Sequence, residues 1–278
     1  MNDTGKLYLV STPIGNLDDI TVRALHTLET VDVIAAEDTR VSGKLLSHFG
    51  IHKPMISYYE HNKKSREDTL LSLLMAGKNV ALISDAGTPA ISDPGADIAA
   101  AAIEKGITVV AVPGASAVLA VLAASGRSTK AFCFEGFLPR EKKARQEKLA
   151  QLARERRTIV IYEAPHRLKQ TLADLTAYLG ENRGISIGRE LTKLHEEMLY
   201  GDLREMQMHF QAVAPRGEFA LVIDGFPEPE PGAPDMEKIS EKLRIMLEQG
   251  MSRKEAAKLL AEKYHCKVKQ IYEIGLKD

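Results

Sequence analysis

Short apolar segments alternate with longer helical segments along the first 112 residues, and this alternation limits the possible folds more than any other feature of the chain. Strands are expected at residues 7–10, 33–36, 55–57, 80–83 and 108–112. Helices are expected at about residues 19–30, 42–49, 65–76 and 96–105. Because parallel strands need a crossover connection, usually a helix, such repetition predicts a mostly parallel sheet with helices on both faces. We expect this α/β domain to span residues 1–122.

The pattern changes after residue 126, where several apolar segments follow one another more closely. Strands are expected at residues 132–134, 158–162, 185–187, 197–201 and 219–223, and a long basic helix separates the first two. Neighbouring strands at such short separations pair in antiparallel fashion. Residues 123–225 are therefore predicted to form a second α/β domain with a mixed sheet.

The last part of the chain has a different composition. Residues 226–235 hold four prolines and three acids and are predicted to be an extended linker. Residues 236–278 are expected to form a small helical module, in which Ser252 and Glu255 match a capping box. Its last two helices resemble a helix-turn-helix pair with a basic surface, although a small bundle used for protein contacts would have the same pattern.

The segment from Val80 to Gly95 indicates a ligand site. An apolar strand runs directly into the loop Ser84-Asp-Ala-Gly-Thr-Pro-Ala-Ile-Ser-Asp-Pro-Gly95. Open α/β sheets bind ligands beyond the carboxyl ends of their strands, and glycines let a ligand approach the backbone closely. The alternative is a surface loop whose Asp and Ser side chains only cap their own backbone.

Charge distribution and short motifs exclude several classes of protein. The net charge is −1, yet residues 140–157 hold eight Lys and Arg against three Glu, and residues 236–278 hold ten against seven acids. These segments suit either nucleic-acid binding or solvated helix faces. There is no Gly-x-x-x-x-Gly-Lys-Ser/Thr loop, and no Gly-x-Gly-x-x-Gly opens a helix after the first strand, which disfavours ATP hydrolysis and the usual dinucleotide fold.

Other features concern the compartment. Cys133 and Cys266 are too few and too far apart for a disulfide framework or a zinc site, and no spacing predicts a metal. No signal segment or membrane-spanning segment is expected, so a cytoplasmic location is predicted.

Five ordered motifs resemble the tetrapyrrole methylase superfamily of S-adenosylmethionine-dependent methyltransferases. They are Thr12-Pro-Ile-Gly-Asn-Leu-Asp-Asp-Ile-Thr21, Ala36-Glu-Asp-Thr-Arg40, Ser84-Asp-Ala-Gly-Thr-Pro89, Phe134-Glu-Gly-Phe-Leu-Pro139 and Gly188-Arg-Glu-Leu-Thr-Lys193. The resemblance runs from Leu7 to Gly225, and it implies two α/β domains with S-adenosylmethionine in the cleft between them. Within the superfamily, the motifs are similar to those of enzymes that methylate the ribose 2′-hydroxyl of a cytidine in small-subunit (16S) rRNA.

The resemblance also implies particular cofactor-binding residues. The first group follows the early strands: Pro13, Ser84, Asp85, Ala86, Gly87, Thr88 and Ile91. The second group comes from the later motifs: Ser116, Tyr162, Glu163, Phe219 and Ala220. Backbone groups are expected to dominate the binding, because S-adenosylmethionine offers shape and a buried adenine rather than one charge to recognise.

Methyl transfer to a hydroxyl requires alignment of the reacting atoms and removal of a proton. Candidate bases or orienting groups are Asp38, Glu190 and Lys193, and Arg40 suits a bidentate contact with phosphate. Each has an alternative structural role. Asp38 and Arg40 could be a capped helix start with a local ion pair, and Glu190 could belong to an inter-domain salt bridge.

The combined prediction is an rRNA (cytidine-2′-O-)-methyltransferase. Its expected partner is small-subunit rRNA in the 30S particle, with the basic helix and the C-terminal module assisting capture, and the family resemblance implies a homodimer. Two alternatives stay open: a methylase of a tetrapyrrole precursor, and a non-catalytic RNA-binding ribosome assembly factor.

Overall fold

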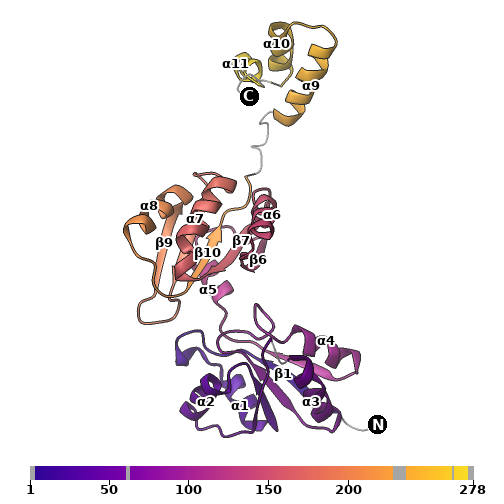
Figure 1. Cartoon of the computed structure of the whole chain (residues 1–278), viewed down its shortest axis with the longest axis vertical. Coiled ribbons are helices and arrows are strands. Elements are labelled where there is room, and N and C mark those ends of the chain that lie inside the picture. The colour runs from indigo at the N-terminus through magenta and orange to yellow at the C-terminus, as the bar shows by residue number, and fades with distance from the viewer. Residues whose placement is uncertain (1–3, 61–62, 228–235, 265, 275–278) are drawn as a thin grey trace. The chain divides into compact units, whose positions relative to one another are not determined.

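The computed structural model describes residues 4–60, 63–227, 236–264 and 266–274. It divides into two compact units, residues 1–226 and residues 227–278. The first unit contains two five-stranded sheets, and the described residues of the second form helices and their connections (Figure 1). No helix among the described residues is both long enough and apolar enough to cross a membrane.

The first sheet is entirely parallel and has the strand order β3-β2-β4-β1-β5. Its strands are β1 (Lys6–Val10), β2 (Val33–Ala36), β3 (Met55–Ser57), β4 (Val80–Ile83) and β5 (Thr108–Val112). The intervening helices are the short η1 (Leu17–Asp19), α1 (Val22–Thr30), α2 (Thr39–His48), α3 (Lys63–Met75) and α4 (Ala96–Glu104). The register aligns Ala36 with Ile83 and Val10 with Val112, so the carboxyl ends of these strands meet at one edge.

Strand β4 shows why this sheet needs helices on both faces. All four of its residues are buried. Val80 and Leu82 pack with α3 and α4, whereas Ala81 and Ile83 pack with α1 and α2. Alternate residues of a strand point to opposite faces, so an uninterrupted apolar strand must lie between two helical layers.

The second sheet is mixed and has the order β6-β7-β10-β8-β9, in which only β6 and β7 are parallel. Its strands are β6 (Phe132–Phe137), β7 (Thr158–Glu163), β8 (Gly184–Arg189), β9 (Glu197–Asp202) and β10 (Phe219–Ile223). Helices α6 (Lys142–Leu152), α7 (Pro165–Leu179) and α8 (Leu203–Ala212) share one apolar cluster with this sheet. Helix α5 (Ala117–Ala124) packs on residues of the opposite face, including Val160 and Val222.

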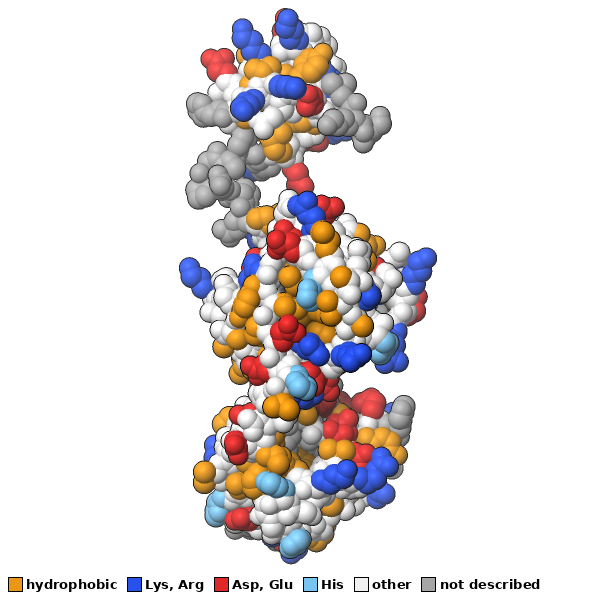
Figure 2. Space-filling view, turned by 90° about the vertical axis from the view of Figure 1, so that its left-hand side faces the viewer, with side chains coloured by type: hydrophobic (Ala, Val, Ile, Leu, Met, Phe, Trp, Pro, Cys, Tyr) orange, Lys and Arg blue, Asp and Glu red, His pale blue; other side chains and the backbone are white. Residues whose placement is uncertain are grey.

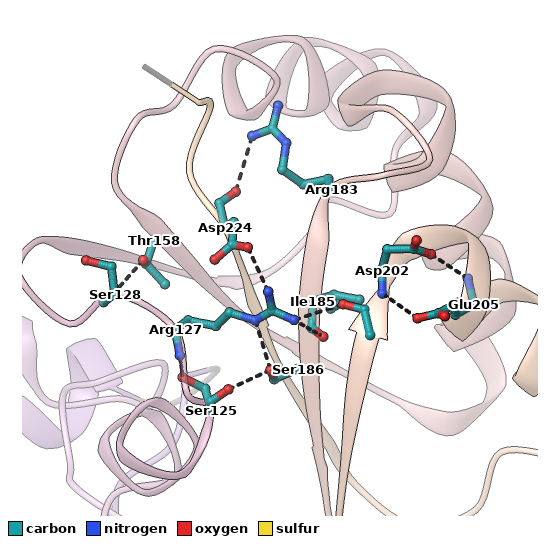
Figure 3. Close-up of polar contacts among 11 residues, drawn as sticks. Ser125, Arg127, Ser128, Thr158, Arg183, Ile185, Ser186, Asp202, Glu205 and Asp224 are labelled. Carbon is teal, nitrogen blue, oxygen red and sulfur yellow. Dashed lines mark hydrogen bonds and ion pairs between the residues drawn. The ribbon is translucent and has the colours of Figure 1, made fainter. Parts of the chain in front are cut away.

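Arg127 fixes the segment after α5 to the second sheet (Figure 3). Its guanidinium donates to Ser186 Oγ at 3.1 Å, to Asp224 Oδ2 at 2.7 Å and to the carbonyl oxygens of Ile185 and Gly201, each at 2.8 Å. These acceptors belong to or directly follow strands β8, β9 and β10. One side chain thereby holds the chain connection against three strands.

The second unit has its own apolar core. Helices α9 (Met236–Glu248), α10 (Arg253–Tyr264) and α11 (Val268–Tyr272) contribute to a single buried cluster. Ser252 and Glu255 form the expected reciprocal cap, in which each residue's backbone N–H donates to the other's side chain at 3.3 Å. The predicted linker lies outside the described residues except for 226 and 227.

The structure confirms the predicted fold class: a parallel sheet, a mixed sheet and C-terminal helices. Two helices, α5 and α8, were not predicted. Helix α5 is apolar on all sides and shows no helical period, whereas α8 starts with a capping box of Asp202 and Glu205 that is readable in the sequence. Because α5 packs on the second sheet, we propose that the boundary between the two α/β domains lies before Ala117 rather than at 122.

Candidate functional site

A cavity of about 480 Å³ lies in the first unit and is lined by residues that follow strands of both sheets. From the parallel sheet it receives the loops after β1, β4 and β5. From the mixed sheet it receives the carboxyl ends of β6 and β7, the loop after β8 and the start of β10. The volume is in the range of pockets that hold small organic ligands.

Hydrogen bonds join the strand ends beneath this cavity. Thr12 and Gly87 form an isolated bridge, with N–H to carbonyl distances of 2.9 and 3.1 Å. The hydroxyls of Ser11 and Thr88 lie 2.9 Å apart, and Thr88 Oγ1 donates to the carbonyl of Ala115 at 3.3 Å. The ends of β1, β4 and β5 are therefore held as one rigid floor.

The loop after β4 has an unusual backbone. Gly87 has φ +85°, and the non-glycine residues Ala90 and Ser92 have φ +69° and +65°. Gly95 has φ +145°, and a Cβ there would lie 2.8 Å from Leu82 Cδ2. Left-handed conformations cost non-glycine residues roughly 1–2 kcal/mol each and concentrate at functional sites. The fold therefore maintains a strained loop along the cavity.

The opposite wall is aromatic. The Tyr162 ring packs edge-on against Phe134 and Phe137, with centroid distances of 4.9 and 5.7 Å. Burial raises the pKa of Tyr162 to about 12, although the Val118 backbone N–H bonds to the phenolic oxygen. Tyr162 is thus a neutral phenol at physiological pH and presents an apolar face with one polar end.

Two close approaches bring the sheets together around the cavity. A Cβ on Gly136 would lie 3.1 Å from Ser92 Oγ. A Cβ on Gly15 would lie 2.4 Å from Lys193 Cγ and 3.0 Å from Thr192 Oγ1. Both approaches require a glycine, because a side chain at either position would collide with the facing loop.

Nine of the twelve predicted cofactor-binding residues line the cavity. Those from the first sheet are Ala86, Gly87, Thr88, Ile91 and Ser116. Those from the second sheet are Tyr162, Glu163, Phe219 and Ala220. The cavity also includes residues outside the predicted set, among them Ile14, Ser92, Asp93, Phe137, Leu191 and Glu218.

The other three predicted residues, Pro13, Ser84 and Asp85, do not line the cavity. Pro13 is buried next to Ile14, which does line it. The Ser84 side chain is buried, and its hydroxyl donates to the carbonyl oxygen of Ala86 at 3.4 Å. Asp85 Oδ1 accepts the Asp38 backbone N–H at 3.0 Å and so joins the ends of β4 and β2.

Asp38 and Arg40 lie outside the lining and pair with each other. Asp38 caps α2 by accepting the Arg40 backbone N–H at 2.8 Å, and their side chains form an ion pair at 2.6 Å. Hydrogen bonds from Arg40 lower the pKa of Asp38 to about 2. A carboxylate with so low a pKa is a weak base.

Glu190 and Lys193 also lie outside the lining, in the loop that contacts Gly15. Their side chains pair at 3.0 Å, and Lys193 also pairs with Glu218 at 3.0 Å. The Glu218 backbone N–H and then Lys193 lower the pKa of Glu190. Burial lowers the pKa of Lys193, but the hydrogen bonds from Lys193 to Glu190 and Glu218 outweigh it, so the pKa is raised. These ion pairs connect the loop to Glu218 at the start of β10 and keep Lys193 protonated.

Asp93 is a lining carboxyl in the loop that the sequence assigned to a ligand site, although it was not among the predicted cofactor-binding or catalytic residues. Burial, followed by the negative charge of Glu37, raises the pKa of Asp93 to about 6, while a hydrogen bond from Ser84 opposes the rise. A readable signal was present, because the dipeptide Ser-Asp occurs twice in this loop, at 84–85 and at 92–93. No group of three or more His, Cys, Asp and Glu among the described residues is arranged to hold a metal ion.

The basic helix is partly neutralised by the protein itself. Arg145 pairs with Asp174 at 2.7 Å, and Lys148 pairs with Glu135 at 2.8 Å. Exposed cations stay at its beginning, where Arg140, Lys142 and Lys143 follow β6. Figure 2 shows Lys and Arg side chains interspersed with acids on the visible face of the first unit, and spread among hydrophobic side chains on the C-terminal unit.

The chain is similar in sequence to known proteins over nearly its whole length. The model of the family Tetrapyrrole (Corrin/Porphyrin) Methylases matches residues 6–207. A relative from Synechocystis sp., named ribosomal RNA small subunit methyltransferase I, is 50% identical over 98% of both chains. A protein of the same name from Halalkalibacterium halodurans is 46% identical over 98% of this chain and 95% of its own length.

Solved structures share the fold at lower identity. A cobalt precorrin-4 methyltransferase is 21% identical, has a TM-score of 0.60 and covers 79% of this chain and 94% of its own. The uroporphyrin-III C-methyltransferase of Thermus thermophilus, in complex with S-adenosylhomocysteine, is 19% identical with a TM-score of 0.56, over 78% of this chain and 97% of its own.

Proposed function

Because the chain belongs to the tetrapyrrole methylase family and, within it, to the ribosomal RNA small subunit methyltransferases I, we propose that it methylates the ribose 2′-hydroxyl of a cytidine in 16S rRNA. The methyl donor is S-adenosylmethionine. The observation that carries this assignment is identity of 46–50% over 98% of the chain with proteins of that name. It extends through the C-terminal unit as well as the two sheets.

The cavity fits S-adenosylmethionine. Its volume of about 480 Å³ suits a ligand of that size. Gly87 lies in the lining with a left-handed backbone and no side chain, and Tyr162, Phe137 and Ala220 supply apolar walls for an adenine. We propose that Ala86, Gly87, Thr88 and Ile91 hold the methionine end. When bound, S-adenosylmethionine supplies an electrophilic methyl group on a sulfonium.

We propose that the protein's own part in the reaction is positional. The floor formed by Thr12, Gly87 and Thr88 fixes the backbone groups on one side of the cavity. The close approach of Gly15 to Lys193 fixes the position of the loop after β8 beside the cavity. Holding two reactants in an attack geometry can contribute several orders of magnitude in rate.

The rRNA is proposed to be captured by exposed cations. Arg140, Lys142 and Lys143 directly follow β6, whose last residue, Phe137, lines the cavity. A phosphate backbone bound by these side chains would bring a splayed nucleotide to the cavity. We propose that the C-terminal unit adds contacts to RNA, that the assembled 30S particle is the substrate, and that the enzyme is a cytoplasmic homodimer.

A tetrapyrrole precursor is the less supported acceptor. The solved tetrapyrrole methylases are about 20% identical to this chain and indicate its fold alone. Binding of an acidic small molecule would not require the two basic segments. A non-catalytic assembly factor is disfavoured because nine of the twelve predicted cofactor-binding residues line one cavity.

The proposal is tested by transfer of labelled methyl from S-adenosylmethionine to small subunits and to free rRNA, both from a strain lacking this protein. Nucleoside mass spectrometry should recover the label as 2′-O-methylcytidine, and the subunit should be the better substrate. Label absent from both RNAs but present on a tetrapyrrole precursor would establish the alternative acceptor. Salt-sensitive RNA binding without any methyl transfer would instead establish an assembly factor.

A further inference from the structure

Among the described residues, the lining of the cavity carries no Lys, Arg or His side chain. Its ionisable acids are Asp93, Glu163 and Glu218. Such a lining suits a cationic cofactor, but it would repel the phosphate groups of an RNA that brings a ribose to the cavity. The phosphates next to the target nucleotide must therefore be held by cations at the rim. The following inference rests on the function proposed above.

The topology of the mixed sheet places two segments of the chain at this rim. Strand β10 runs antiparallel to β7 and pairs Phe219 with Glu163, so β10 begins at the edge where β6 and β7 end. Strand β8 also ends at this edge, with Arg189 opposite Phe219. The segment after β6 contains the exposed cations assigned to RNA above, and the segment before β10 contains Arg216.

The backbone at Arg216 is fixed by its neighbours. Its carbonyl oxygen accepts the Arg189 Nε–H at 2.8 Å, and Arg189 in turn pairs with Glu197 at 3.2 Å. Gly217 follows with φ +83°, and a Cβ there would lie 2.5 Å from Glu190 Cδ. The turn that contains Arg216 is therefore held against the end of β8.

The Arg216 side chain is free to bind a ligand. It is exposed, and no hydrogen bond or ion pair joins it to another described residue. The neighbouring cations Arg189 and Lys193 are instead paired with acids. An exposed guanidinium on a fixed backbone, two residues before the lining residue Glu218, suits a bidentate contact with a phosphate group.

We propose that Arg216 binds a phosphate group of the rRNA next to the target nucleotide. It does so on the β10 side of the strand ends, whereas Arg140, Lys142 and Lys143 bind the RNA backbone on the β6 side. Phosphate contacts fix the register and orientation of a nucleic acid without reading its sequence. Contacts on both sides of the cavity hold the intervening ribose at its opening.

The test measures binding and methylation of small subunits, prepared from a strain lacking the protein, at several salt concentrations. Arg216→Gln should raise the KM for subunits roughly tenfold, because it removes a charge-assisted hydrogen-bond pair. The slope of log affinity against log salt should decrease by about one. The kcat at saturating subunits should be retained, because the phosphate contact is the same in the ground state and the transition state. Calorimetry should find S-adenosylmethionine binding to the free enzyme unchanged.

Two further variants separate a phosphate contact from other effects. Arg216→Lys keeps the charge but loses the planar fork, so it should keep the salt slope and recover only part of the affinity. Arg156→Gln is the matched control. Arg156 is exposed and unpaired among the described residues, but it lies just before β7, at the opposite edge of the same sheet. This control should bind subunits as wild type does.

The possible outcomes are distinct. If Arg216→Gln keeps the wild-type KM and salt slope, the proposal is wrong. It is also wrong if this variant weakens S-adenosylmethionine binding, because Arg216 then contacts the cofactor, or if Arg156→Gln has an equal effect, because general electrostatic attraction then explains the binding. A wild-type enzyme that binds subunits but methylates neither RNA would overturn the proposed function. The change of salt slope in Arg216→Gln would still report the phosphate contact in that case.

Discussion

Individual partners, rather than position alone, determine the pKa values of the acids near the cavity. Asp38 follows β2 and has its pKa lowered to about 2 by Arg40. Asp93 lies on the neighbouring loop, and burial beside Glu37 raises its pKa to about 6. Two aspartates therefore differ in pKa because they differ in burial and in the charged groups beside them.

The raised pKa of Asp93 predicts a cost to stability. The pKa rises from 3.8 in the unfolded chain to about 6 in the fold, so folding loses free energy as pH increases between these values. Asp93→Asn should stabilise the protein above pH 6, by roughly 1 kcal/mol once partial exposure is discounted. Below about pH 4 it should have no effect, because the carboxyl is then protonated in both states. Melting temperatures at low and at neutral pH provide the check, and equal changes at both would refute the linkage.

Gly15 is predicted to be required for closure of the cavity. In Gly15→Ala the new Cβ would lie 2.4 Å from Lys193 Cγ, so the loops must separate. We expect a loss of about 1–3 kcal/mol in stability together with weaker S-adenosylmethionine binding, measured by urea unfolding and calorimetry. Gly43→Ala in α2 is the control, because its Cβ would meet only Met55 Cε at 3.6 Å. Unchanged cofactor binding in Gly15→Ala would argue against the closed loop.

Arg127 is predicted to be essential for the second sheet. Replacing it by Met removes four hydrogen bonds and leaves Asp224, Ser186 and two carbonyl groups without their partner (Figure 3). Unpaired, partly buried polar groups cost about 1–3 kcal/mol each, with incomplete additivity. We expect a total loss of about 2–4 kcal/mol, visible as a lower urea midpoint. Arg204→Met, at an exposed ion pair, should change the midpoint little.

At the scale of elements, the cations of helix α6 fall into two groups, one paired within the protein and one exposed to solvent. Arg145 and Lys148 face the protein and pair with Asp174 and Glu135. Lys142 and Lys143 are exposed in its first turn. Formal charge in the sequence therefore overestimates the charge available to a nucleic acid.

This division predicts different effects from neutralising different cations of α6. The double variant Lys142→Gln/Lys143→Gln should raise the KM for rRNA and reduce the salt slope of binding by about one for each phosphate that is no longer bound. Binding of S-adenosylmethionine should not change. Arg145→Gln should instead lower stability, since it breaks the hydrogen bonds to Asp174 and Thr171.

The appropriate control is Lys105→Gln, an exposed lysine at the end of α4. It removes a charge at a position that we do not assign to RNA. If it weakens rRNA binding as much as the α6 variant does, general electrostatic attraction would explain the effect.

At the scale of the whole molecule, the chain consists of two units with separate cores. Residues 1–226 contain the two sheets and the cavity, and residues 227–278 contain a helical cluster around Leu243 and Leu260. A unit with its own core can fold alone. We therefore expect the chemistry to stay with the first unit when the second is removed.

Ending the chain after Pro227 should leave a folded protein that binds S-adenosylmethionine normally. Its affinity for small subunits should fall roughly tenfold, equivalent to about 1.4 kcal/mol, and kcat at saturation should persist. Filter binding and calorimetry provide the measurements. Full affinity in the shortened protein would show that the C-terminal unit does not bind RNA.

The sequence alone determined the architecture and identified part of the cavity lining. Apolar runs such as Val80–Ile83 can be satisfied only between two helical layers, and turn residues mark where each strand ends. Nine of the twelve residues that the motifs indicated therefore lie at the cavity. Helix α5 was missed because an apolar segment without a polar face has no period to read.

Only the tertiary structure decided which acids face the cavity. Asp38, Glu190 and Lys193 follow strands as the sequence indicated, but local ion pairs hold them outside the lining. Asp93 reaches it because Ala90 and Ser92 adopt left-handed backbone conformations that no sequence rule assigns to these residues. Side-chain direction in a loop depends on backbone angles and on contacts from distant strands, and those exist only once both sheets have packed.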